Sequence, residues 1–130
     1  MKKFFALVAV VFLSAVFAPS NYAQNEGDII LTLEQLEHPA AMSLYDQAST
    51  QNQHENLTAL LKEAEKAYYK CNTIDELYLL DVRMDIIGKM IDRTREREPI
   101  TKIEADYKIL RRKLSKSIYD QDKNAYDSFQ

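Results

Sequence analysis

The stretch TIDELYLLDVRMDIIGKMIDRTRERE, which covers residues 73–98, decides the fold. Its apolar residues recur at steps of three and four, which is the spacing of an α-helix, and they form two stripes offset around it. The first stripe is Leu77, Leu80, Met84, Ile87 and Ile91; the second is Leu79, Val82, Ile86 and Met90. A surface helix needs only one apolar face. We therefore expect a central helix with neighbours on two sides, in which Leu80 and Ile86 are both buried.

Both ends of this helix are marked in the sequence. Thr73 and Glu76 fit the capping box, in which a hydroxyl and a carboxylate bind free backbone N–H groups. Pro99 should end the helix, because the residue before a proline avoids the α-helical region. Gly88 lies mid-helix at a cost of about 1 kcal/mol relative to alanine, so we expect it to mark a close helix crossing. The approach of a ligand or of another backbone is the alternative.

The remaining sequence also predicts helices, because no stretch alternates between apolar and polar residues over the length of a strand. We expect helices over residues 39–49, 56–71 and 102–120, with a short helical turn before His38; one kinked helix across the following proline is the alternative. Residues 49–55 contain no large apolar side chain and are expected to form a loop. The prediction is an all-α fold, a small three- to four-helix bundle with a long central helix at about residues 73–98.

The N-terminus has the layout of a secretory signal peptide. Lys2 and Lys3 precede an apolar run at residues 4–18, which is too short for a typical membrane span, and a more polar segment follows. We expect cleavage after Ala23, with cleavage after Ala18 or a retained membrane anchor as alternatives. The chain then divides into a signal peptide, residues 1–23, and a single helical domain with loose ends, residues 24–130. The predicted location is periplasmic or extracellular.

Charge and cysteine content narrow the function further. The net charge of −3 becomes −5 when the two lysines of the signal peptide are removed, which argues against nucleic-acid binding. Cys71 is the single cysteine, so the domain contains no internal disulfide. It falls on the apolar stripe of its predicted helix, where a cysteine acts as a small core residue. An intermolecular disulfide is the alternative.

The last predicted helix carries the candidate partner-binding face. Lys108, Arg112 and Lys116 are spaced by four residues, so they line one exposed stripe of that helix. By contrast, residues 24–61 contain six acidic residues and no lysine or arginine. The stripe is therefore either a solvated face partly paired with the acidic half of the chain or a docking face for another protein with an acidic surface. Anionic lipid headgroups are the alternative partner.

Residues that carry catalytic or metal chemistry are sparse. His38 and His54 do not stand at the spacing of a zinc site, and the sequence has no glycine-rich phosphate loop. Asp81 and Asp85 lie one helical turn apart, and paired carboxylates can perform acid–base chemistry. A surface ion pair between Asp85 and Lys89 is the simpler interpretation. We therefore predict no enzyme activity, no catalytic residue, no cofactor and no metal.

Two short segments resemble known periplasmic proteins. Residues 31–35, Leu-Thr-Leu-Glu-Gln, resemble the Leu-Thr-x-x-Gln motif of small helical periplasmic stress chaperones, whose second copy has only a degenerate match at residues 100–104. Residues 124–126, Asn-Ala-Tyr, are similar to the end of the soluble periplasmic b-type cytochromes. Those proteins have a haem-ligating histidine after the tyrosine, and Asp127 stands in its place here. We assign the chain to neither family.

Taken alone, the sequence favours a secreted or periplasmic helical protein that binds another protein without catalysis, of the adaptor, inhibitor or immunity type. One alternative is a protein similar to the periplasmic stress chaperones. The other is a carrier of haem or another small ligand in the core of a four-helix bundle. Its candidate ligands would be Met42, Met84 and Met90, with His38 or His54 as a second ligand.

Overall fold

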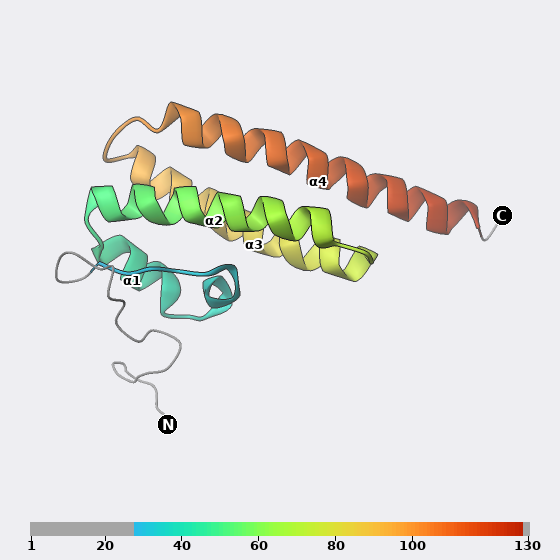
Figure 1. Cartoon of the computed structure of the whole chain (residues 1–130), viewed down its shortest axis with the longest axis horizontal. Coiled ribbons are helices and arrows are strands. Elements are labelled where there is room, and N and C mark those ends of the chain that lie inside the picture. The colour runs from blue at the N-terminus through green and yellow to red at the C-terminus, as the bar shows by residue number, and fades with distance from the viewer. Residues whose placement is uncertain (1–27, 129–130) are drawn as a thin grey trace, which may run out of the picture.

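The computed structural model describes residues 28–128, and its regular elements within this range are all helices (Figure 1). They are the 3-10 helix η2 (Leu33–Glu37) and the α-helices α1 (Ala41–Gln47), α2 (Thr50–Lys70), α3 (Ile74–Arg95) and α4 (Thr101–Asp127). The predicted all-α class and the long helix beginning near Thr73 are confirmed. The predicted signal peptide lies outside the described residues. Within them, no helix combines the length and apolar character that a membrane crossing requires.

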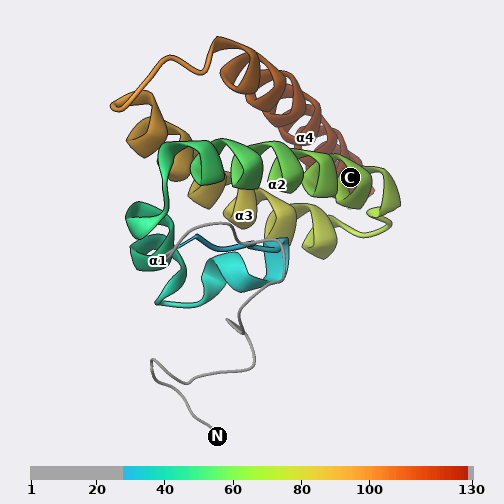
Figure 2. The same ribbon diagram turned by 60° about the vertical axis from the view of Figure 1, so that its left-hand side comes forward.

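Helix α3 lies at the centre of the bundle, as predicted. It packs against α2, α4 and η2, while η2 and α1 lie on the opposite side of the α2–α3 pair from α4 (Figure 2). The capping box is present: Thr73 Oγ1 accepts the Glu76 N–H at 3.2 Å, and the Glu76 carboxylate accepts the Thr73 N–H at 3.1 Å. The helix ends at Arg95, four residues before Pro99.

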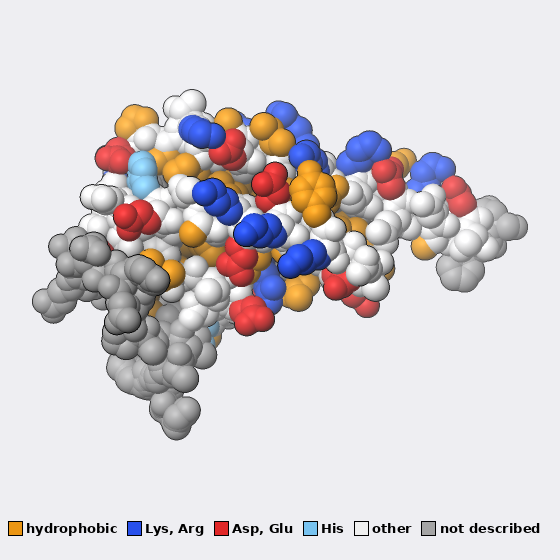
Figure 3. All heavy atoms as spheres, viewed as in Figure 1, with side chains coloured by type: hydrophobic (Ala, Val, Ile, Leu, Met, Phe, Trp, Pro, Cys, Tyr) orange, Lys and Arg blue, Asp and Glu red, His pale blue; other side chains and the backbone are white. Residues whose placement is uncertain are grey.

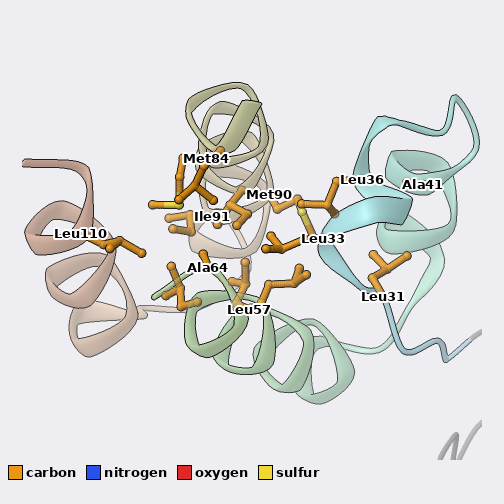
Figure 4. Close-up of a cluster of buried hydrophobic side chains, with 14 of the residues drawn as sticks. Leu31, Leu33, Leu36, Ala41, Leu57, Ala64, Met84, Met90, Ile91 and Leu110 are labelled. Atoms are coloured by element: carbon orange, nitrogen blue, oxygen red, sulfur yellow. The ribbon is translucent and has the colours of Figure 1, made fainter. Parts of the chain in front are cut away.

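One continuous core runs across these layers. Side chains of α2 and α3 meet in its middle, Leu110 enters from α4 on one side, and Leu33 and Leu36 enter from η2 on the other (Figure 4). Every residue of the first predicted stripe of α3 is buried in it. Each such side chain stabilises the fold by about 1.5–3 kcal/mol relative to an exposed position.

The second predicted stripe of α3 is largely not buried, which corrects the sequence-based expectation. Leu79 is 42% exposed and Val82 is 48% exposed, Ile86 is half-buried, and only Met90 is fully inside. The neighbours α2, α4 and η2 leave one face of α3 only partly covered within the described residues, and Leu79 and Val82 lie on that face. Leu80 is therefore buried as expected, whereas Ile86 only borders the core.

The predicted loop at residues 49–55 is wrong, because α2 already begins at Thr50. Ser49 caps the helix by accepting the Asn52 N–H at 3.1 Å. Asn52, Gln53 and Asn56 are then buried, although none is apolar. An amide can be buried without a large penalty when its hydrogen bonds are made.

Two of these amides hold residues 28–32, which we call the N-terminal strap. The Ile29 N–H donates to Asn52 Oδ1 at 2.9 Å, and the Leu31 N–H donates to Asn56 Oδ1 at 2.8 Å. Asn56 Nδ2 returns a hydrogen bond to the Ile29 carbonyl at 3.0 Å. Asn52 and Asn56, one turn apart on α2, thus bind the backbone N–H and carbonyl groups of the extended strap. In a β-sheet, a neighbouring strand would bind such groups.

Gly88 marks a close helix crossing, as expected. A Cβ atom at this position would lie 2.5 Å from the hydroxyl oxygen of Tyr107 on α4, which is closer than packing allows. That hydroxyl donates to the Met84 carbonyl at 3.1 Å. Glycine therefore makes room for a tyrosine that fastens α4 to the backbone of α3.

Helix α4 is longer than predicted and continues to Asp127 instead of ending near Asp120. Ion pairs between residues four apart, Lys116 with Asp120 and Lys123 with Asp127, support its last turns. This part of α4 projects past the rest of the bundle (Figure 1).

Candidate partner-binding surface

The predicted basic stripe is exposed on α4. Lys108, Arg112 and Lys116 all lie at the surface. Lys116 forms an ion pair with Asp120 at 2.8 Å, which raises the pKa of this lysine. Among the described residues, Lys108 and Arg112 form no ion pair. Basic and acidic side chains also alternate along the projecting end of α4 (Figure 3).

The acidic N-terminal half pairs with α3 instead of with this stripe. Glu37 binds Arg83 at 3.2 Å, and Asp46 forms an ion pair with Arg93. The partial pairing with the acidic half that the first explanation included is therefore absent from these ion pairs, whereas its main part, a solvated face, agrees with the exposure of the stripe. The positive charge of α4 faces solvent.

A groove with a volume of about 590 Å³ lies between α2 and α4, and the three residues of the stripe do not line it. Its apolar lining includes Leu61 and Leu110, which belong to the buried core, and Ile109, which is 50% exposed. Lys62, Lys102 and Lys113 line it together with the acidic residues Glu65 and Asp106. The groove is therefore an apolar opening onto the core, surrounded by charges with one positive charge in excess.

Contacts between α2 and α4 hold the groove together beyond Lys113. The Tyr68 hydroxyl is 2.6 Å from the Ser117 hydroxyl and donates to the Lys113 carbonyl at 3.3 Å. Lys113 Nζ in turn donates to the Tyr69 hydroxyl at 3.0 Å, and this hydrogen bond raises the pKa of the lysine. Lys113 is thus held at the groove as a cation.

Sequence reasoning missed this groove. Its two walls come from helices that are far apart in the sequence: Tyr68 and Ser117, which are in contact, are 49 residues apart. The spacing of residues in the sequence shows which of them share a face of one helix, but it does not show between which two helices a groove will form. The one available signal was Ile109, an apolar residue off the buried stripe of α4.

The two aspartates considered for acid–base chemistry are both paired with one arginine. Arg111 on α4 binds Asp81 at 2.9 Å and Asp85 at 3.1 Å. Its guanidinium also donates to the Asp81 carbonyl at 3.2 Å. The expected pair between Asp85 and Lys89 is therefore replaced, because antiparallel packing of α3 and α4 brings Arg111 to both carboxylates. This arrangement ties two helices together.

The remaining candidates for chemistry are dispersed. Cys71 is half-buried, its thiol donates to the Ala67 carbonyl at 3.3 Å, and burial together with the charge of Glu76 raises the pKa of that thiol. A raised pKa keeps cysteine in its unreactive thiol form. His54 Nε2 lies 2.7 Å from a carboxylate oxygen of Glu98. Within residues 28–128, the histidine, cysteine and acidic side chains form no group of three or more that could hold a metal ion.

Comparison with known proteins gives no further guide, because no protein-family model, curated protein or solved structure matches the chain. The role of the molecule has to be argued from its own surface.

Proposed function

We propose that this chain is an exported, non-enzymatic protein that binds an acidic amphipathic helix of another protein in the groove between α2 and α4. The observation that carries the proposal is the groove itself, which leads from solvent onto core residues Leu61 and Leu110. The signal-peptide pattern of residues 1–23 supports export.

The position of the groove between two helices favours a helix as the partner. Three long helices leave a position open between α2 and α4, and a fourth helix placed there would complete a four-helix arrangement. Helices bind such grooves by laying an apolar face against apolar walls. Ile109, which is half exposed in the free protein, would then be covered by the partner.

The charges around the groove favour an acidic partner. Lys62 and Lys113 line it with Glu65 as the one remaining acidic side chain, whereas Lys102 is already paired with Asp106 at 3.1 Å. Lys108 and Arg112 add positive charge to the exposed surface of the same helix, with Lys108 on the side that faces α3. Such exposed charges mainly accelerate and orient association and add less to the final affinity.

The chemistry of the remaining molecule supports binding over catalysis or cofactor transport. Asp81 and Asp85 are both ion-paired with Arg111, and the Cys71 thiol has a raised pKa. Of the candidate haem ligands, Met84 and Met90 lie in the packed core at 0% and 1% exposure.

The test places a photo-crosslinking amino acid at position 109 and, in a matched protein, at position 82. Both residues are about half exposed, on α4 and α3 respectively. The tagged proteins are incubated with the exported proteins of the source organism, and crosslinked species are identified by mass spectrometry. We expect one acidic partner captured from position 109 and not from position 82.

Binding of that purified partner is then measured by calorimetry. We expect Ile109→Asp to weaken it at least about tenfold, because a charge would be buried unpaired. The combined variant Lys108→Glu/Arg112→Glu/Lys116→Glu should slow association, while Val82→Asp changes nothing. Circular dichroism verifies that helicity is unchanged. Binding that is indifferent to Ile109→Asp, or binding to anionic vesicles in place of a protein, would contradict the proposal.

A further inference from the structure

We propose that a second copy of this chain docks on the outer face of α3, forming an antiparallel homodimer distinct from the groove interaction. The face is the outer stripe, defined as Asp75, Leu79, Val82, Ile86 and Lys89. These residues are spaced by four, three, four and three. That alternation is the seam of a two-helix coiled coil.

The outer stripe differs from its surroundings because its apolar side chains are exposed and its charged side chains have no ion-pair partner within the described residues. Leu79 and Val82 are 42% and 48% exposed, although both are apolar. Charged neighbours on either side are engaged within the protomer: Arg83 binds Glu37, and Asp85 binds Arg111. Within the described residues, Asp75 and Lys89 form no ion pair, and both are exposed.

The order of charges selects the partner and its orientation. The stripe is acidic at its N-terminal end, apolar in the middle and basic at its C-terminal end. Asp75 and Lys89 each stand seven residues from Val82. When two copies cross antiparallel with a two-fold axis at Val82, each Asp75 meets the Lys89 of the other copy. A parallel pair would instead oppose aspartate to aspartate and lysine to lysine.

A two-fold axis gives every contact twice, which is why a short stripe can suffice. The apolar part nonetheless covers only two turns of α3. Interfaces below about 1,200 Å² in total belong to weak or transient complexes. We therefore place the dimer in the micromolar range, where it exchanges with the monomer.

The test is sedimentation equilibrium of the protein expressed from its full coding sequence, from low micromolar to near-millimolar concentration. We expect a reversible monomer–dimer equilibrium. Val82→Asp should raise the dissociation constant at least about tenfold, because two like charges would meet at the axis. Ile109→Asp, a matched change on α4, should leave it unaltered. A wild-type protein that is monomeric throughout, or a dimer indifferent to Val82→Asp, overturns the proposal.

A charge exchange tests the orientation. Lys89→Asp and Asp75→Lys should each weaken the dimer several-fold, and the double variant should restore it. Restoration needs contact between copies, because the two residues lie about 21 Å apart along one helix at 1.5 Å per residue. Failure of the double variant to recover overturns the antiparallel arrangement. Since Val82→Asp leaves the α2–α4 groove intact, loss of the dimer and loss of partner binding are separable outcomes.

Discussion

At the start of α2, Asn52, Gln53 and Asn56 are at most 2% exposed, whereas Leu79 and Val82 on α3 are 42% and 48% exposed. Polar residues are therefore buried at the start of α2, and apolar residues are exposed on α3. The difference lies in what each region has to contact. The amides meet backbone groups that need partners, and the rest of the described chain covers the outer face of α3 only in part.

Asn52 and Asn56 bind the strap, and the third buried amide, Gln53, belongs to a separate polar cluster. Gln53 Nε2 donates to the Tyr45 carbonyl at 2.8 Å, and its Oε1 accepts the Thr94 hydroxyl at 2.9 Å. The Tyr45 hydroxyl contacts Thr94 in turn. Because each group has a partner, the cluster joins α1, α2 and α3 without leaving an unsatisfied buried atom among these side chains.

The largest effect is expected where an apolar residue is truly buried. Leu80→Ala should destabilise the protein by about 2–5 kcal/mol, because it removes apolar contacts and leaves a cavity. Ile86→Ala should cost clearly less, since Ile86 only borders the core. Lys89→Ala should have almost no effect. Thermal melts followed by circular dichroism compare the three variants, and equal losses at residues 80 and 86 would show two fully buried faces on α3.

Removing a buried amide should come next. Asn56→Ala leaves the Leu31 N–H and the Ile29 carbonyl without their partner, at a cost of about 2–4 kcal/mol. The control is Asn72→Ala in the exposed α2–α3 connection, which should change stability little. Urea unfolding measures both. If the two variants lose the same amount, the strap does not depend on its hydrogen bonds to α2.

Alkaline pH should lower the free energy of unfolding through Tyr45 of this polar cluster, by an amount similar to or slightly smaller than the loss in Asn56→Ala. Burial raises the pKa of Tyr45 to about 12, partly opposed by its hydrogen bond to Thr94. The folded state therefore holds this proton where the unfolded chain, with a pKa near 10, has lost it. The resulting contribution is complete below pH 10 and declines by about 2–3 kcal/mol as the pH rises towards 12.

The measurement for this prediction is the free energy of unfolding between pH 9 and about pH 12, for wild type and Tyr45→Phe. The phenylalanine variant lacks the titrating hydroxyl, so its stability should fall less steeply over this interval. Tyr107 also has a pKa raised by burial and should contribute equally in both proteins. Identical slopes would show that Tyr45 does not retain its proton.

The smallest effect is expected at the outer stripe. Val82→Ser should change the stability of the dilute protein by no more than about 0.5 kcal/mol, as for other surface substitutions. Thermal melts at several protein concentrations supply the measurement. A large loss at every concentration would mean that Val82 is covered within one protomer, and a loss confined to high concentration would locate its contact in a dimer.

The fold was accessible from sequence because its signals are local. Period and capping in residues 73–98 identified the central helix, and Gly88 identified the crossing. The first turns of α2 escaped because amides carry no apolar period, and their partners lie 23 to 27 residues away in the strap. The end of α4 was underestimated, although its lysine–aspartate pairs at a spacing of four were already present in the sequence.

Only part of the candidate surface could be predicted from the sequence, because only part of it depends on local spacing. Lys108, Arg112 and Lys116 follow from spacing within one helix. The groove between α2 and α4 and the Arg111 pairs with Asp81 and Asp85 depend on the packing of one helix against another. The exposure of Leu79 and Val82 also depends on packing, because an apolar stripe shows that a helix can be covered there without showing which molecule covers it.

The N-terminal strap also affects the order in which the molecule assembles. Its hydrogen bonds to α2 reach forward along the chain, to Asn52 and Asn56, and the following Leu33 binds Glu63. During synthesis these residues emerge after the strap, so the strap has no place to dock until α2 has formed. A segment that docks on a finished helix can also detach from it without unfolding the bundle. In hydrogen exchange, the amides of Ile29 and Leu31 should therefore report the opening of a separate small unit, while the amides of α3 report the unfolding of the whole domain.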